Sequence, residues 1–276
     1  MKNNFENHID LYLSSLRKCQ ISDAMAYSMD GGKRFRPRII FSIVKGYGID
    51  ESIAYDAALA LELIQTYSLI HDDLPAMDND DMRRGKPSLH KAFREDIAIL
   101  TGDQLLTDAF RVIADSRSYN AQCKVSMISA LSRYAGLDGM IYGQLLDVTS
   151  DGKKIDKEEL FAIQDNKTGG LFKVACLMAM YIADQKEEKY FTELGSLIGE
   201  IFQNQDDLFD KIKSEEEMGK NLSDDRNDKA TAFSVYNIDE LQKTIDQEFI
   251  CLDNYLENAS FDTQYLKNLL KILKER

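Results

Sequence analysis

The chain has 276 residues, of which 44% are hydrophobic, so it can bury one large core and does not require a second domain. Aspartate and glutamate number 47 against 34 lysines and arginines, which gives a formal net charge of −13. This balance argues against a nucleic-acid partner, because a phosphate backbone needs a basic protein face.

Helix is the predicted secondary structure for most of the chain. All three prolines, Pro37, Pro75 and Pro87, lie in the first third, and neither β-branched alternation nor an Asn-Gly turn favours strands. No repeat, low-complexity segment or linker divides the sequence, so we expect a single all-α domain over residues 1–276. Hydrophobic periodicity predicts helices over residues 51–71, 95–119, 121–149, 166–183 and 187–213.

Two of these helices lead into acidic clusters. Residues 54–70 are apolar on every side, with Asp56 and Glu62 as their only charges, a pattern typical of a buried central helix. This helix runs directly into Asp72-Asp73. The last predicted helix is interpreted as ending in the cluster at 206–210, with the sequence DDLFD.

Such clusters indicate a bound cation. Aspartates at a helix C-terminus meet the negative end of the helix dipole and repel one another. Asp206 and Asp210 are four residues apart and share a helix face. Asp72 and Asp78 flank Pro75, so the chain must leave regular helix between them. One DDxxD is commonly a solvated helix end, but two clusters of hard oxygen ligands favour Mg²⁺, which binds carboxylates together with substrate phosphates.

Cationic residues beside glycines accompany both clusters, and a cation at a helix start is typical of an anion site. Metal-binding carboxylates that alternate with anion-binding cations indicate a diphosphate substrate bridged by Mg²⁺. Nucleotide binding is unsupported, because neither GxxxxGK[ST] nor GxGxxG occurs. The cations are Lys33, Arg34 and Arg36 in the segment 31–37, Arg83 and Arg84 in the segment 80–87, Lys167 before Gly169, and Lys220 after Gly219.

The cysteines and the apolar runs indicate in which cellular compartment the protein lies. Cys19, Cys123, Cys176 and Cys251 show no Cys-x-x-Cys spacing, which is typical of a reduced cytoplasmic chain. The first residues lack the apolar stretch of a signal peptide. The longest apolar run, at 174–183, is far shorter than the ~20 residues that cross a bilayer. We therefore expect a cytoplasmic protein without membrane insertion.

The joint pattern resembles the trans-polyprenyl diphosphate synthases, most closely the bacterial farnesyl type, over nearly the whole chain. The resemblance implies an isoprenoid synthase fold, in which helices surround a deep central cavity and two aspartate motifs face each other across its mouth. The matching motifs are GGKRFRP at 31–37, YSLIHDDLPAMDNDDMRRGKPSLH at 67–90, Gly102-Asp103, GQLLD at 143–147, Lys167-Thr168, FQNQDDLFD at 202–210 and Gly219-Lys220.

The resemblance also implies roles for individual residues and a homodimer. An allylic diphosphate is expected to bind through three Mg²⁺ ions. The implied metal ligands are Asp72, Asp78 and Asp206, with Asp73, Asp207 and Asp210 supporting or completing the coordination. The cations implied for the allylic diphosphate are Arg83, Lys167 and Lys220. The residues implied for isopentenyl diphosphate are Gly32, Lys33, Arg36 and Arg84, with Gln65 in support. Lys229 matches a further basic position near the site mouth.

The mechanism implied is ionisation of the allylic substrate, followed by attack of the isopentenyl double bond. Mg²⁺ and the cations stabilise the departing diphosphate. Thr168, the Lys167 carbonyl and Gln203 direct oxygen dipoles at the allylic cation. The released diphosphate then takes the proton, so no protein base is required.

Product length is expected to depend on Tyr67. It lies five residues before Asp72, which is about 7.5 Å along the helix axis at ~1.5 Å per residue. Its ring would form a floor under the growing chain, while the small Ser68 leaves the adjacent volume open. By resemblance this pattern indicates mainly farnesyl diphosphate; the alternative is that Tyr67 is a packed core residue.

The chain departs from the family at Tyr142, at residues 221–223 and at Gln65, where affinity and product length are expected to change. Four alternative functions stay open. A geranylgeranyl or geranyl diphosphate synthase would differ in product length. A class I terpene cyclase typically lacks both the second DDxxD and the GGKRxRP-like site. A non-catalytic subunit usually has damaged aspartate motifs, whereas all six motif aspartates are present here.

Overall fold

The computed structural model describes residues 4–218 and 231–274. Within these ranges the only strands are β1 (Met82–Arg83) and β2 (Lys86–Pro87), so the predicted all-α class is confirmed. The helices are α1 (Asn4–Ser15), α2 (Gln20–Met29), α3 (Phe35–Gly46), η1 (Glu51–Ala54), α4 (Tyr55–Asp72), α5 (Leu89–Ala92), α6 (Glu95–Asp115), α7 (Ala121–Ala135), α8 (Met140–Ser150), α9 (Lys157–Lys167), α10 (Gly169–Ile182), α11 (Glu188–Met218), η2 (Ala232–Ser234), α12 (Ile238–Leu256) and α13 (Gln264–Lys274).

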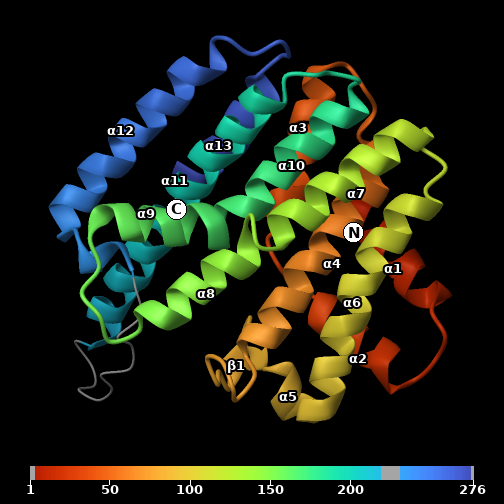
Figure 1. Cartoon of the computed structure of the whole chain (residues 1–276), viewed down its shortest axis with the longest axis horizontal. Coiled ribbons are helices and arrows are strands. Elements are labelled where there is room, and N and C mark those ends of the chain that lie inside the picture. The colour runs from red at the N-terminus through yellow and green to blue at the C-terminus, as the bar shows by residue number, and fades with distance from the viewer. Residues whose placement is uncertain (1–3, 219–230, 275–276) are drawn as a thin grey trace.

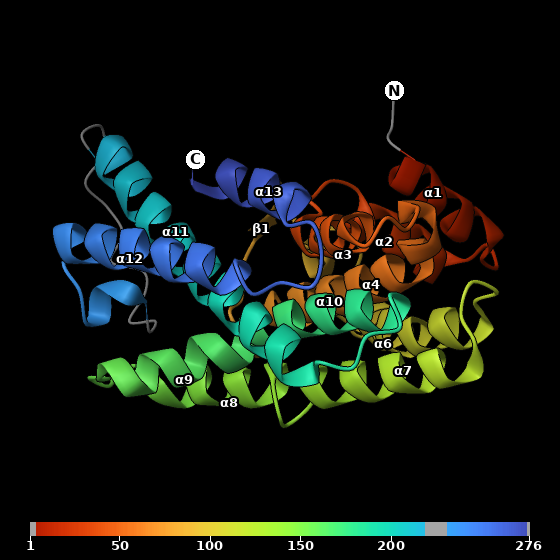
Figure 2. The same ribbon diagram turned by 90° about the horizontal axis from the view of Figure 1, so that it is seen from above.

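Helices α4 and α10 form the centre of the molecule. Residues 57–64 of α4 and 169–180 of α10 are all buried, as expected for helices that are apolar on every side. Figure 2 shows these two helices between a layer that contains α3 and α13 and a layer that contains α7, α8 and α9. The predicted burial of the helix before Asp72 is therefore confirmed. No helix in the described ranges is both long and apolar enough to span a membrane.

The predicted helix over 121–149 was wrong as a single element. Helix α7 ends at Ala135 and α8 begins at Met140, and a short loop separates the two helices (Figure 1). The reason is a close approach that only glycine permits: a Cβ atom at Gly139 would lie 2.1 Å from the carbonyl oxygen of Tyr134. After the break α8 packs against α9, the helix that ends at Lys167.

Three other predicted boundaries also differ. The predicted helix over 95–119 ends at Asp115, and the predicted helix over 166–183 is interrupted at Thr168, between α9 and α10. Helix α11 continues to Met218, so the cluster at 206–210 does not lie at a helix C-terminus. The helix-dipole argument therefore applies to Asp72 and not to Asp206.

A short hairpin follows α4, although no Asn-Gly turn predicted it. Met82 pairs with Pro87 and Arg83 with Lys86. The two turn residues, Arg84 and Gly85, have φ angles of 54° and 74°, and positive φ at both central residues is what a type I′ turn requires. The hairpin carries the arginine pair back toward the end of α4.

Candidate active site

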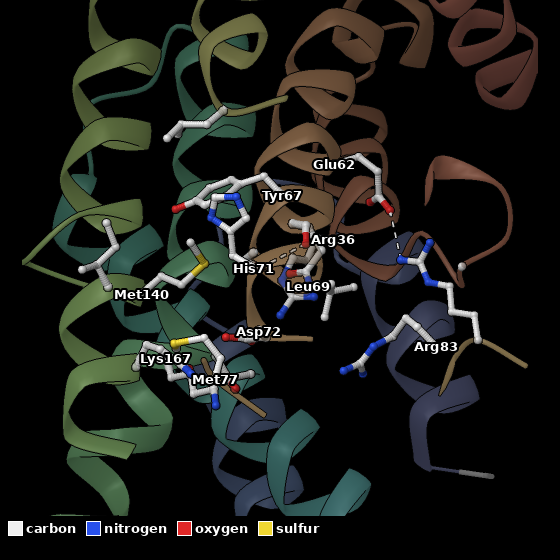
Figure 3. Close-up of a pocket in the computed structure, with 18 of the residues that line it drawn as sticks. Arg36, Glu62, Tyr67, Leu69, His71, Asp72, Met77, Arg83, Met140 and Lys167 are labelled. Atoms are coloured by element: carbon white, nitrogen blue, oxygen red, sulfur yellow. Dashed lines mark hydrogen bonds and ion pairs between the residues drawn. The ribbon is translucent and has the colours of Figure 1, made fainter. Parts of the chain in front are cut away.

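A cavity of about 1100 Å³ lies at the C-terminal end of α4, with walls from α3, α4, α6, α8, α9 and α11 (Figure 3). It brings together residues that the sequence had placed in separate motifs. The predicted site residues that line it are Gly32, Lys33, Arg36, Gln65, Tyr67, Ser68, Asp72, Arg83, Arg84, Lys167, Thr168, Gln203 and Asp206.

The first acidic cluster separates into residues with different surroundings. Asp72 lines the cavity, and its backbone carbonyl accepts a hydrogen bond of 2.8 Å from the Asp78 N–H, which returns the chain to the helix end. Asp73 is only 2% exposed and accepts from Arg83 Nε at 2.9 Å. Burial raises the pKa of the Asp73 carboxyl against the opposing effect of Arg83. Asp73 therefore holds Arg83, and Asp78 lies outside the cavity lining.

The second acidic cluster is divided in the same way. Asp206 lines the cavity, and Asp210 is exposed one turn further along α11. Asp207 instead accepts from Gln203 Nε2 at 2.8 Å and from the Ala232 N–H at 2.7 Å, while burial raises its pKa to about 6. Gln203 Oε1 in turn accepts from the Thr168 hydroxyl at 2.7 Å. Asp207 thereby orients the Gln203 amide at the cavity wall.

No three His, Cys, Asp or Glu side chains in the described part of the chain gather closely enough to hold a metal by themselves. Asp72 and Asp206 nevertheless both line one cavity, together with Arg83 and Lys167. Mg²⁺ prefers one or two carboxylates combined with substrate phosphate oxygens and water. The donor set therefore fits Mg²⁺ that shares its ligands with a bound diphosphate.

Lys167 owes its place to the GQLLD segment. A Cβ atom at Gly143 would lie 2.0 Å from the Lys167 backbone nitrogen, so only glycine lets α8 pass the end of α9 this closely. Asp147, one turn further along α8, lies 2.5 Å from Lys167 Nζ. The sequence had assigned no role to Asp147, although Asp147 is the last residue of the GQLLD motif at 143–147. Tyr142, the residue before Gly143, is 40% exposed.

Replacing Gly143 by alanine should therefore disturb Lys167. We expect a loss of roughly 1–3 kcal/mol in the free energy of unfolding, the usual cost of overpacking, together with a lower kcat. Chemical denaturation and steady-state kinetics measure the two effects. Tyr142→Ala is the matched control on the exposed neighbour and should change neither. Wild-type stability and kcat in Gly143→Ala would show that the helix contact does not position Lys167.

The second group of cations lies where the hairpin meets the loop before α3. Arg84 Nη1 donates to the Gly31 carbonyl at 3.1 Å, and a Cβ atom at Gly32 would lie 3.0 Å from Arg84 Cζ. The Arg36 guanidinium lies 4.4 Å from the centre of the Phe172 ring. Burial lowers the pKa of Arg36 to about 10, against the opposing charges of Glu62 and Asp206. Arg36 thus remains cationic at neutral pH, and Lys33 is exposed at the rim.

The far end of the cavity is apolar. Tyr67 is 6% exposed, and its ring lies edge-to-face with His71, with ring centres 5.7 Å apart. Leu106 and Met140 line the same cavity, and Figure 3 shows Tyr67 further along α4 from Asp72. Ser68 also lines the cavity and donates to the Gln65 carbonyl. The predictions for Lys220, Lys229 and residues 221–223 fall outside the described residues.

Comparisons with known proteins agree with this arrangement. The family model described as Polyprenyl synthetase matches residues 18–273. The chain is 38% identical to a farnesyl diphosphate synthase of Bacillus subtilis, over 100% of this chain and 95% of that protein. It is 36% identical to geranylgeranyl pyrophosphate synthase 7 of Arabidopsis thaliana, over 96% and 78% of the two chains.

Among solved structures, the chain is similar to a geranyltransferase from Helicobacter pylori complexed with magnesium and isoprenyl diphosphate. The TM-score is 0.85 at 28% identity, and the match covers 99% of this chain and 96% of that chain. The fold predicted from the motifs, helices around a deep central cavity, is therefore confirmed.

Proposed function

Since this chain belongs to the polyprenyl synthetase family and is therefore a prenyltransferase, we propose that it condenses isopentenyl diphosphate with dimethylallyl and geranyl diphosphates. The condensation is head-to-tail, releases diphosphate and gives mainly farnesyl diphosphate. A single domain over residues 1–276 carries the activity. The observation that supports this most strongly is the cavity in which Asp72 and Asp206 lie with two separate groups of cations, because two diphosphates have to be held at once.

The allylic diphosphate is bound at the aspartates. Asp72, Asp78 and Asp206 would hold three Mg²⁺ ions, and Asp210 would complete the coordination. Mg²⁺ bound there neutralises the charge that develops on the leaving diphosphate. The Helicobacter pylori relative, complexed with magnesium and isoprenyl diphosphate, supports this assignment. Asp73 and Asp207 act indirectly, because they hold Arg83 and Gln203.

The chain's own residues bind and orient the reacting groups. Arg83 and Lys167 bind the allylic diphosphate as it leaves, together with Lys220. Lys229 is assigned as a further basic position near the site mouth, and both Lys220 and Lys229 lie outside the described residues. Thr168, Gln203 and the Lys167 carbonyl direct oxygen dipoles toward the positive charge on the allylic carbon. The departing diphosphate accepts the proton lost after condensation, so no protein base is needed.

Isopentenyl diphosphate is held by the second group of cations, with its double bond directed at the allylic carbon. Lys33, Arg36 and Arg84 bind its diphosphate beside Gly32, and Gln65 supports the site from α4. Each of these residues lines the cavity. Charge-assisted hydrogen bonds from arginine to phosphate oxygens are among the stronger contacts in proteins.

Replacing Lys33 by alanine should specifically weaken the binding of isopentenyl diphosphate. Loss of one charge-assisted contact, worth about 1.5–3 kcal/mol, should raise its KM roughly 10- to 100-fold. The KM for geranyl diphosphate should stay within about twofold of wild type, well below that change. Arg38→Ala, which removes an exposed cation of the adjoining helix α3 outside the cavity lining, is the matched control. A Lys33→Ala enzyme altered only in the allylic KM would reverse the assignment of the two sites.

The proposal is tested by incubating the purified chain with isopentenyl diphosphate, Mg²⁺ and each allylic diphosphate in turn, and sizing the products. A fifteen-carbon diphosphate is expected from dimethylallyl and geranyl primers. A ten- or twenty-carbon main product would favour the geranyl or geranylgeranyl alternative, and the Arabidopsis thaliana relative makes the latter the stronger of the two. A hydrocarbon from the allylic substrate alone would identify a cyclase, and no turnover a non-catalytic subunit.

We also propose a homodimer in the cytoplasm. Along α8 a row of apolar side chains is exposed, with Ile141 at 48%, Leu145 at 52% and Val148 at 51%. Residues spaced three to four apart share one helix face, and such a stripe is typical of an interface. Leu145→Glu should convert the dimer into a monomer, and light scattering measures the change in molar mass. An unchanged mass would exclude this face as the interface, and cell fractionation tests the location.

A further inference from the structure

Glu62 is a buried carboxylate in the middle of the apolar helix α4. It is 4% exposed and is surrounded along the helix by buried apolar residues. A carboxylate without partners would be strongly unfavourable there. Its partners therefore explain its presence, and none of them belongs to the aspartate clusters.

The first partner is Arg34, the residue that precedes α3. Arg34 Nη1 donates to Glu62 Oε1 at 2.7 Å, and its Nε donates to Glu6 Oε1 of α1 at 2.9 Å. Arg34 also donates to the Met29 carbonyl. Its φ angle of 49° lies in the left-handed region, which is unfavourable for a residue other than glycine unless its surroundings hold it there. The buried ion pair with Glu62 supplies that hold.

The second partner is Arg84, at the turn of the hairpin. Arg84 Nη2 lies 4.0 Å from Glu62 Oε1, and its Nη1 donates to the Ser28 and Gly31 carbonyls at 3.3 and 3.1 Å. Glu62 therefore lies between an arginine of the loop before α3 and an arginine of the hairpin. Figure 3 shows Glu62 on the same side of the view as Arg83 of the hairpin, with Arg36 nearer the centre.

Electrostatics give this position its importance. Four cations line the same cavity, and like charges gathered around one site repel one another. They are Lys33, Arg34, Arg36 and Arg84. Glu62 offsets that repulsion from the protein side. Glu62 lines the cavity too, but it is only 4% exposed and is engaged by Arg34, so the cations remain the groups that receive an incoming diphosphate.

We infer that Glu62 is a positioning residue for isopentenyl diphosphate: it fixes Arg34 and Arg84, and through them the arrangement of Lys33 and Arg36 that receives the second diphosphate. This inference rests on the function proposed above. Glu62 touches no reacting atom and acts only through the arginines.

The test is Glu62→Gln, which keeps the shape of the side chain and removes its charge. The KM for isopentenyl diphosphate should rise roughly tenfold, the size expected for the loss of one charge-assisted interaction. The KM for geranyl diphosphate and kcat should change less than about twofold. Asp56→Asn is the matched control on the same helix. Asp56 interacts with His8 at 3.0 Å and Ser116 at 2.6 Å, away from the cavity, so both KM values should stay unchanged.

A melting curve and two further variants separate the outcomes. Glu62→Gln could lower kcat only in proportion to a lower folded fraction and leave the KM for isopentenyl diphosphate unchanged. That result would show a merely structural role for Glu62 and overturn the inference. If Glu62→Gln does not fold, Glu62→Asp keeps the charge but withdraws it by one methylene; it must then raise the same KM selectively, and failure to do so overturns the inference. Lys33→Ala separates failure of this inference from failure of the proposed function. An unchanged KM for isopentenyl diphosphate in Lys33→Ala would refute the proposed binding site itself.

Discussion

Replacing Asp72 or Asp206 by alanine is expected to lower kcat by roughly 10²–10³-fold, the effect of removing one group that stabilises transition-state charge. Both carboxylates line the cavity and would hold Mg²⁺ at the diphosphate that departs. An interaction that is stronger in the transition state than in the ground state changes kcat more than KM. The KM for isopentenyl diphosphate should therefore change little, in contrast to Lys33→Ala. Steady-state kinetics with each substrate varied in turn measure the difference.

The control for this prediction is Asp138→Asn. Asp138 lies in the turn between α7 and α8, its side chain is 74% exposed, and it is 3.9 Å from Arg133. Its loss removes the same formal charge at a site remote from the cavity lining and should leave kcat unchanged. If Asp72→Ala and Asp206→Ala both kept wild-type kcat, the carboxylates could not be the groups that stabilise the leaving diphosphate.

Replacing Tyr67 by alanine is expected to lengthen the product beyond fifteen carbons. The ring lies in the cavity wall, 6% exposed, further along α4 than Asp72, in the direction in which the proposed function requires the growing chain to extend. Its removal leaves space that another five-carbon unit can enter. A cost of about 2–5 kcal/mol in the free energy of unfolding accompanies such a large-to-small change. Chromatographic sizing of the dephosphorylated products measures the shift.

Tyr67→Phe is the matched control, because it keeps the ring and removes only the hydroxyl. Burial raises the pKa of Tyr67 to about 12, so the native hydroxyl is neutral and its loss should leave the product length unchanged. A folded, active Tyr67→Ala enzyme that still stops at the wild-type length would place the floor elsewhere. Tyr67 would then be only a packed core residue.

Burial of α4 could be predicted from the sequence because only two charges interrupt its apolar residues. Its termination at Asp72 was predictable as well, since Pro75 prevents the helix from continuing. The break at Gly139 could not be read in this way, because the contact that requires glycine involves the carbonyl of Tyr134 in the folded chain. The same holds for Gly143, whose neighbour is Lys167 on another helix.

The motif at 206–210 groups neighbouring aspartates together, although helix geometry indicates that their surroundings differ. Successive residues of a helix point about 100° apart, so Asp206 and Asp207 are not expected to share the same surroundings. The structure directs Asp206 into the cavity and Asp207 toward the Ala232 N–H. Glu62 was visible as a lone charge on a buried helix, but its partner Arg34 lies 28 residues earlier. Only the fold brings the two together.

The measurement that tests the central claim most directly is condensation of isopentenyl diphosphate with geranyl diphosphate by the purified chain, with Mg²⁺, with excess chelator, and with Mg²⁺ added back. The carboxylates of Asp72 and Asp206 repel a diphosphate unless a cation lies between them. We predict that farnesyl diphosphate forms with Mg²⁺, that chelation abolishes it and that added Mg²⁺ restores it. Undiminished condensation in excess chelator, or no condensation under any of the three conditions, would contradict the account.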